Sequence, residues 1–110
     1  MPKELIQSFI LETGLSKTVA LRIFAKFFAT LQAELEQITA AVLQQDWPQA
    51  SLLAHTLKGS SGNLRLLELA HQASLLDLSC RDRQTDQAQA NLAILTTLVG
   101  QLIAEYYEIA

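Results

Sequence analysis

Apolar side chains recur along this chain at alternating intervals of three and four residues, and this periodicity restricts the fold more than any other feature. The longest run is Leu21, Phe24, Phe28, Leu31, Leu35, Ile38 and Val42. With about 3.6 residues per helical turn, such a run forms one apolar stripe along a single long helix. No segment shows the sustained alternation of apolar and polar residues that is typical of a strand. The pattern predicts an all-α protein.

Three shorter stripes follow, and helix-breaking residues separate them. Asp46 is a good N-cap and Pro48 suits a first helical turn, so a new helix is expected there. The polar stretch 81–86 is expected to be a loop, with Thr85 or Asp86 as the cap of the last helix. The three stripes are Ala50, Leu53, Leu57, Ser60 and Leu64; Leu66, Leu69, Ala73, Leu76 and Cys80; and Leu92, Leu95, Val99, Leu102 and Tyr106.

The N-terminal segment predicts a short additional helix over residues 2–13. Pro2 suits its first turn, Gly14 suits the position after its end, and Ser16 caps the long helix that follows. Four stripes joined by short loops predict an antiparallel up-down four-helix bundle over about residues 16–108, with the short helix across one end. A length of 110 residues fits a single domain, residues 1–110.

The net charge and the composition of the chain limit which kinds of partner and which cellular location are expected. The net charge is −3 and no basic run is present, which argues against nucleic acid as a partner. No apolar stretch approaches the length of about 18 residues that a membrane span needs, and the N-terminus does not resemble a signal peptide. Cys80 is the single cysteine, which fits a reducing compartment. We therefore expect a cytoplasmic protein, by default a monomer.

The segment 54–62 places His55 on the face of its helix that lies opposite the apolar stripe. Around His55 on that face lie the small residues Ser51, Gly59 and Gly62. A glycine inside a helix costs up to about 1 kcal/mol relative to alanine, so stability alone does not explain two of them beside one histidine. Small neighbours would let the backbone of another protein, and a phosphoryl group, approach the imidazole closely.

Two further residues flank the histidine on the same helix. Lys58 lies one turn after His55, where its ammonium can neutralise phosphoryl oxygens, and Leu52 lies on the other side. A neutral imidazole nitrogen is a nucleophile, and phosphoryl transfer depends mainly on positioning and charge neutralisation. These residues suit a histidine that carries a phosphoryl group.

The residues around His55 resemble a known motif. The segment reads His55-Thr56-Leu57-Lys58-Gly59-Ser60-Ser61 and is similar to the H-x-L-K-G-S-[SA] motif of histidine-containing phosphotransfer (HPt) domains. The similarity covers about residues 20–105 and extends to Asp46-Trp47, Leu69-Ala70 and Leu76-Asp77. It implies a four-helix bundle in which His55 is phosphorylated and Lys58 stabilises the phosphoryl group.

The resemblance also implies a place in a two-component phosphorelay. His55 would accept a phosphoryl group from a receiver-domain aspartate and donate it to another receiver, without autokinase activity. The expected partners are response-regulator receiver domains, with a hybrid sensor histidine kinase as a further candidate. The chain is expected to bind no cofactor or metal, and Mg²⁺ is expected in the receiver. Candidate docking residues are Ser51, Leu52, Gly59, Gly62 and Arg65.

Arg65 departs from the family pattern, which usually has glycine there, in the sequence N-L-G. That glycine eases the bend after the histidine helix, so we expect the bend at Gly62-Asn63 instead. An arginine at this position is also able to contact an acidic surface of a partner. It leaves open an alternative function, in which the bundle binds receivers or other proteins without carrying phosphate.

Other candidate residues favour simpler interpretations. His71 has no ligand partners at suitable spacing and is expected to be a surface histidine. Glu68 and Asp77 lie about 13 Å apart along one helix, too far for acid–base cooperation, so Asp77 is expected to be solvated or to cap a helix. Ile23 and Phe27 lie beside the long stripe, where they either widen the core or form an apolar docking patch.

Overall fold

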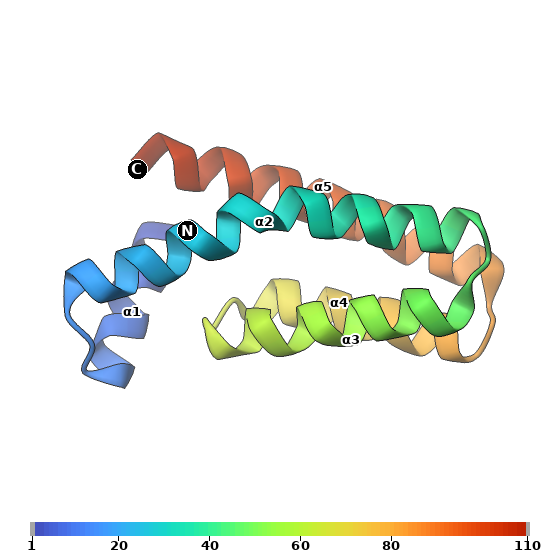
Figure 1. The fold of residues 1–110 in the computed structure, drawn as a ribbon, viewed down its shortest axis with the longest axis horizontal. Helices are drawn as coiled ribbons and strands as arrows, with labels where there is room; N and C mark the ends of the chain where they lie inside the picture. The colour runs from blue at the N-terminus through green and yellow to red at the C-terminus, as the bar shows by residue number, and fades with distance from the viewer. Residues whose placement is uncertain (1, 110) are drawn as a thin grey trace.

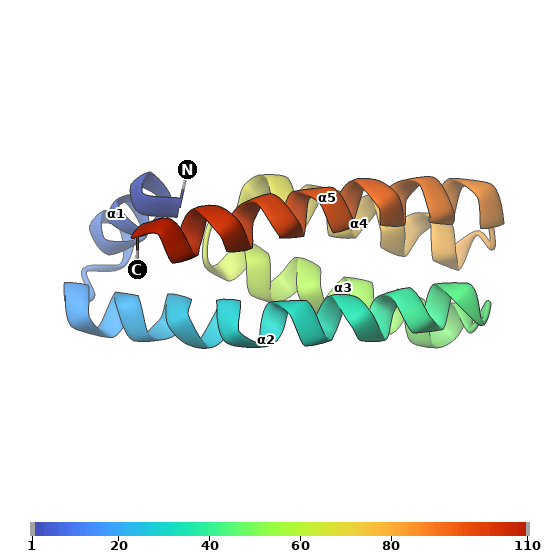
Figure 2. The ribbon, with the colours of Figure 1, turned by 90° about the horizontal axis from the view of Figure 1, so that it is seen from above.

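The computed structural model describes residues 2–109, which form five α-helices joined by short turns (Figure 1). The long helices α2 and α5 lie beside a shorter hairpin of α3 and α4, and α1 lies at the end that the hairpin does not reach (Figure 2). The helices are α1 (Pro2–Thr13), α2 (Lys17–Leu43), α3 (Trp47–Asn63), α4 (Leu67–Arg81) and α5 (Thr85–Ile109). The predicted all-α bundle with a short N-terminal helix is confirmed. Residues 1 and 110, the predicted limits of the domain, lie outside the described residues.

Most helices begin and end where the sequence predicts. The side chain of Ser16 accepts a hydrogen bond from the backbone N–H three residues later at 3.2 Å, and that of Asp46 does the same at 3.3 Å. Gly14 follows α1 with a φ of +71°, a conformation that glycine adopts without strain. One cap prediction is wrong: Thr85 is already the first helical residue, so Gln84, rather than Thr85 or Asp86, precedes α5.

The three turns within the bundle share one geometry. In each, the residue after the C-cap is not glycine but adopts a left-handed conformation, and two backbone N–H groups donate back to carbonyls of the last helical turn. This arrangement is the Schellman motif, which usually has glycine at the left-handed position. The left-handed residues and their φ angles are Gln45 (56°), Arg65 (61°) and Arg83 (53°).

The bend after α3 therefore occurs at Arg65. The N–H of Arg65 donates to the carbonyl of Gly62 at 3.0 Å, and the N–H of Leu66 donates to that of Ser61 at 2.9 Å. The prediction of a bend at Gly62-Asn63 was wrong, because both residues remain helical. Arg65 adopts the backbone conformation that a glycine would adopt at this position.

We expect Gln45→Gly to raise the free energy of unfolding by about 1 kcal/mol, because a residue with a Cβ pays about 1–2 kcal/mol in the left-handed region. Arg65→Gly relieves the same backbone strain but loses the side-chain contacts of Arg65 with α1, so its gain should be smaller. Urea unfolding followed by circular dichroism measures both. A destabilised Gln45→Gly variant would contradict the assignment of strain to this turn.

The apolar stripes meet in one continuous core. α2 packs against α3 and α5, and α4 packs against α3 and α5, so each bundle helix has two neighbours. Phe27 is buried and Ile23 is partly buried against the core, which supports the core interpretation of both. Cys80 is fully buried, and this burial raises the pKa of its thiol to about 11. Residues 2–109 contain no helix that is both long and apolar enough to cross a membrane.

The long stripe differs from its prediction at its first residue. Leu21 is 39% exposed, whereas Ala20 and Phe24 are fully buried. A strict alternation of three and four residues drifts by about 20° per heptad relative to a straight helix, so the buried face at the start of α2 passes through Ala20. Below it, Phe9 of α1 packs edge-on against Phe24 with 5.3 Å between ring centroids. α1 thus joins the same core.

Candidate functional site

His55 lies in the middle of α3 and is turned toward solvent. Its side chain is 63% exposed, whereas Ala54, on the flank of the helix, and Leu57, on its far side, are fully buried. The two buried neighbours fix the rotation of α3 about its axis, and this rotation presents the imidazole at the surface. The site is therefore positioned by core packing on the far side of the same helix.

Asp77 of α4 lies behind the imidazole. Its side chain is only 2% exposed, and its Oδ2 lies 3.5 Å from Nδ1 of His55. The expectation of a solvated or capping Asp77 was wrong, because α4 packs along α3 and turns this carboxylate into the seam between them. A signal was present in the sequence: Asp77 follows Ala73 by four residues and precedes Cys80 by three, which is the spacing of the buried stripe.

Two further side chains hold the Asp77 carboxylate. Ser51 of α3 donates a hydrogen bond from its hydroxyl to Oδ1 at 2.5 Å. Arg81, one turn later on α4, donates from Nε to Oδ1 at 3.0 Å and from its terminal nitrogen to Oδ2. The hydrogen bond from Arg81 lowers the pKa of Asp77, as do the Ser51 hydroxyl and the charges of Arg81 and His55, whereas burial opposes the change. The carboxylate is therefore ionised at neutral pH.

Arg81 is a functional candidate that the sequence reasoning assigned to a loop. It is the last residue of α4, and its pairing with Asp77 raises the pKa of its guanidinium. The signal that points to it is the spacing of four residues between an acid and a base on one helix. Ser51 was predicted as a docking residue, and the structure turns its hydroxyl toward Asp77 instead of toward solvent.

The outer surface around His55 consists of small or unpaired side chains. Lys58 is exposed and forms no ion pair within residues 2–109. A Cβ added at Gly59 or Gly62 would meet, beyond the adjoining residues and backbone of its own helix, no atom of the described domain within 4 Å. Leu52 is 59% exposed on the same helix. The internal packing of the domain therefore requires glycine at neither position.

The structure does not bring Arg65 to this surface. Its Nε pairs with the carboxylate of Glu12 at 2.5 Å, and its guanidinium lies over the ring of Phe9, 5.6 Å from the centroid. Its terminal nitrogen also donates to the carbonyl of Asn63. Arg65 thus ties the turn after α3 to α1.

No alternative chemistry competes at the surface of the described chain. His71 is exposed on α4. Within residues 2–109 there is no group of three or more histidine, cysteine, aspartate or glutamate side chains placed to bind a metal ion. His55 is the histidine that lies beside a buried carboxylate.

The family of this chain follows from its similarity to a family model of known proteins. No curated protein and no solved structure matches the chain. Residues 22–105, most of the 110 residues, match the family model of the Hpt domain, and the match includes all of α3 and α4 and the whole set of residues around His55. The chain therefore belongs to the Hpt domain family, whose role is histidine phosphotransfer in phosphorelays.

Proposed function

We propose that His55 accepts a phosphoryl group from the aspartyl phosphate of one receiver domain and donates it to the aspartate of another. The observation that carries this proposal is an exposed imidazole whose Nδ1 faces a buried, ionised carboxylate. Nε2, on the other side of the ring, is then the nucleophile. Its lone pair forms the N–P bond as the P–O bond to the receiver aspartate breaks, and the aspartate leaves as a carboxylate.

Asp77 would act as a positioning residue. A small rotation of the imidazole brings Nδ1–H, now 3.5 Å away, within hydrogen-bond distance of Oδ2. A hydrogen bond there fixes the tautomer that keeps the lone pair on Nε2. The negative charge also stabilises the positive charge that the ring gains when the N–P bond forms. Ser51 and Arg81 hold the carboxylate in place for both purposes.

In the proposed transfer, this chain and the receiver would each supply a cation that neutralises charge on the phosphoryl oxygens. Lys58 lies one turn from His55, and no side chain of the described residues forms an ion pair with it, so its ammonium is available. We infer that the receiver supplies Mg²⁺ with its own phospho-aspartate and that this chain binds no cofactor or metal. Arginine and lysine groups together with Mg²⁺ are the usual means of stabilising transferring phosphoryl groups.

Receiver docking would use the small-residue surface around His55. Leu52 supplies an exposed apolar contact, and Gly59 and Gly62 allow close approach. Arg65 is left out of this surface because α1 engages its side chain. The partners we propose are response-regulator receivers and a hybrid sensor histidine kinase, with the chain acting as one monomeric module in the cytoplasm.

Gly59→Ala should separate docking from stability. Alanine is better than glycine in a helix by about 1 kcal/mol, and the added methyl group meets no atom of the domain, so the variant should be more stable than the wild type. The same methyl group would stand between α3 and a docked receiver, so we expect transfer to slow by about tenfold or more, the factor that corresponds to about 1.4 kcal/mol. Thermal unfolding and single-turnover transfer measure the two effects.

Gly100→Ala is the matched control for this substitution. Gly100 lies within α5, and a Cβ there also meets no atom within 4 Å. We expect the same gain in stability with an unchanged transfer rate. Equal transfer rates for both alanine variants would show that Gly59 is not part of the docking surface.

The experiment that tests the proposed function is a transfer assay. A panel of receiver domains is phosphorylated with a small phosphodonor and Mg²⁺, the protein is added, and acid-labile label on it is measured. Label on the wild type is the expected result. Binding to receivers without any label would contradict the proposal and favour an interaction module that does not carry phosphate.

A further inference from the structure

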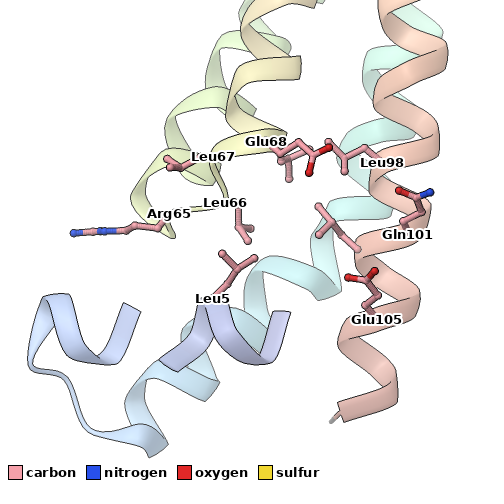
Figure 3. A pocket seen from close by; sticks show the side chains of 10 residues that line it. Leu5, Arg65, Leu66, Leu67, Glu68, Leu98, Gln101 and Glu105 are labelled. Atoms are coloured by element: carbon pink, nitrogen blue, oxygen red, sulfur yellow. The ribbon is translucent and has the colours of Figure 1, made fainter. Parts of the chain in front are cut away.

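A pocket lies at the opposite end of the molecule from the turn that joins α2 and α3, between α1, the turn after α3, α4 and α5 (Figure 3). Its volume is about 340 Å³, at the lower end of the range of about 300–1,000 Å³ that is usual for small-molecule sites. None of the residues around His55 lines it. The pocket is therefore separate from the proposed phosphotransfer surface.

The pocket follows from the unequal lengths of the helices. α3 and α4 have 17 and 15 residues, whereas α2 and α5 have 27 and 25, so part of α5 extends beyond the hairpin. α1 covers this end only in part. The apolar walls come from three elements and the turn: Leu5, Leu66, Leu67, Leu69, Leu98 and Leu102.

The polar side chains of the pocket are two acids, Glu68 and Glu105, one amide, Gln101, and one base, Arg65. Glu68 contributes a carboxylate from α4 and Glu105 one from α5, and neither forms an ion pair within the described residues. Among the described residues that line the pocket, Arg65 is the one cation, but Glu12 and the carbonyl of Asn63 engage its guanidinium. Figure 3 shows the Arg65 side chain pointing away from the leucines. An apolar floor is thus combined with two carboxylates that form no ion pair with any cationic side chain in the described part of the chain.

We propose that this pocket binds a small organic cation, in which an apolar body carries a primary ammonium group. The body would displace water from the leucine walls, and the ammonium would lie between the carboxylates of Glu68 and Glu105. A ligand with the same apolar body but a carboxylate in place of the ammonium would be repelled by Glu68 and Glu105. The two carboxylates differ in how strongly they attract a cation: Glu68 lies in the first turn of α4, where the helix dipole offsets part of its charge. Glu105 lies toward the C-terminal end of α5, where the dipole adds to it.

The test compares three probes of equal chain length, hexylammonium, hexanol and hexanoate. Each is titrated into the isotopically labelled protein, and amide shifts are followed by NMR. Hexylammonium should shift the amides of Leu66, Leu98 and Gln101 at the lowest concentration, hexanol at a higher one, and hexanoate least. Added salt should weaken only the hexylammonium response, because screening acts on the charged contact. Equal responses to hexylammonium and hexanoate, or no shift at these amides, would overturn the proposal.

Charge-removing variants locate the ammonium. Glu105→Gln should weaken hexylammonium binding by about two- to fivefold, the effect of one partly exposed ion pair, and Glu68→Gln by less. Glu36→Gln, at an exposed position of α2 outside the pocket, is the matched control and should leave the affinity unchanged. An equal loss in all three variants would reveal attraction to the net charge of the protein and contradict a specific site. The experiment involves no phosphate, so its result is independent of the function of His55.

Discussion

His55→Gln is expected to accept no phosphoryl group from any receiver. Glutamine is close to histidine in size and keeps a polar group at the surface, but an amide nitrogen has no lone pair available for attack on phosphorus. Because the side chain is 63% exposed, the substitution should leave the free energy of unfolding nearly unchanged. Acid-labile label after incubation with a phosphorylated receiver measures the loss.

His71→Gln is the control for this experiment. His71 is the second of the two histidines and is also exposed on a helix, so both variants make the same chemical change. It should take up as much label as the wild type. Full labelling of His55→Gln, or loss of labelling in His71→Gln, would show that the phosphorylated residue does not lie on α3.

Asp77→Asn is expected to slow transfer by about 10- to 100-fold, by analogy with the loss when a carboxylate that orients a metal-binding histidine from behind is removed. An amide in place of the carboxylate is able to donate as well as accept, so it no longer selects the tautomer with the lone pair on Nε2. It also removes the charge that balances the phosphorylated ring. Single-turnover transfer rates and the ¹⁵N shifts of the His55 ring nitrogens report the two effects.

The stability of the same variant should depend on pH. The pKa of Asp77 is lowered in the folded protein, so the ionised carboxylate stabilises the fold above the unfolded pKa of about 4. That contribution is lost as the pH falls through the lower folded value, where the wild type and Asp77→Asn should converge. Asp82→Asn, a change at the exposed C-cap of α4 five residues later, should show neither the rate effect nor the convergence. A constant difference between wild type and Asp77→Asn down to strongly acidic pH would contradict the assignment.

The fold was predictable because the apolar stripe of each helix shows which of its faces is buried in the core. Phe24, Leu31 and Ile38 lie in the core where the spacing of the stripe places them. Leu21 is the exception, since a strict heptad spacing drifts around a straight helix. The position of the turns was predictable, but their conformation was not. Nothing in the local sequence distinguishes Arg65 in a left-handed conformation from a glycine-mediated bend one turn earlier.

The site was predictable only within one helix. The outward direction of His55 follows from the period of α3 alone, whereas the pairing with Asp77 requires the register of α3 against α4. The contact between Arg65 and Glu12 joins residues 53 positions apart and depends on how α1 docks. Contacts within a helix follow from the spacing of its residues. Contacts between helices depend on how the helices pack against each other, which the sequence of one segment does not show.

The three left-handed turn residues have a consequence for how many substitutions this domain tolerates. Gln45 and Arg83 are exposed and pay the conformational cost without the contacts that Arg65 makes. Domains of this size have a net stability of about 5–15 kcal/mol, so relieving two turns by about 1 kcal/mol each is a substantial increase. Some destabilising substitutions in the α3–α4 seam would unfold the natural chain. A protein that also carries Gln45→Gly and Arg83→Gly should remain folded when the same substitutions are made. The number of substitutions that the α3–α4 seam tolerates therefore depends on turn residues that lie outside the seam.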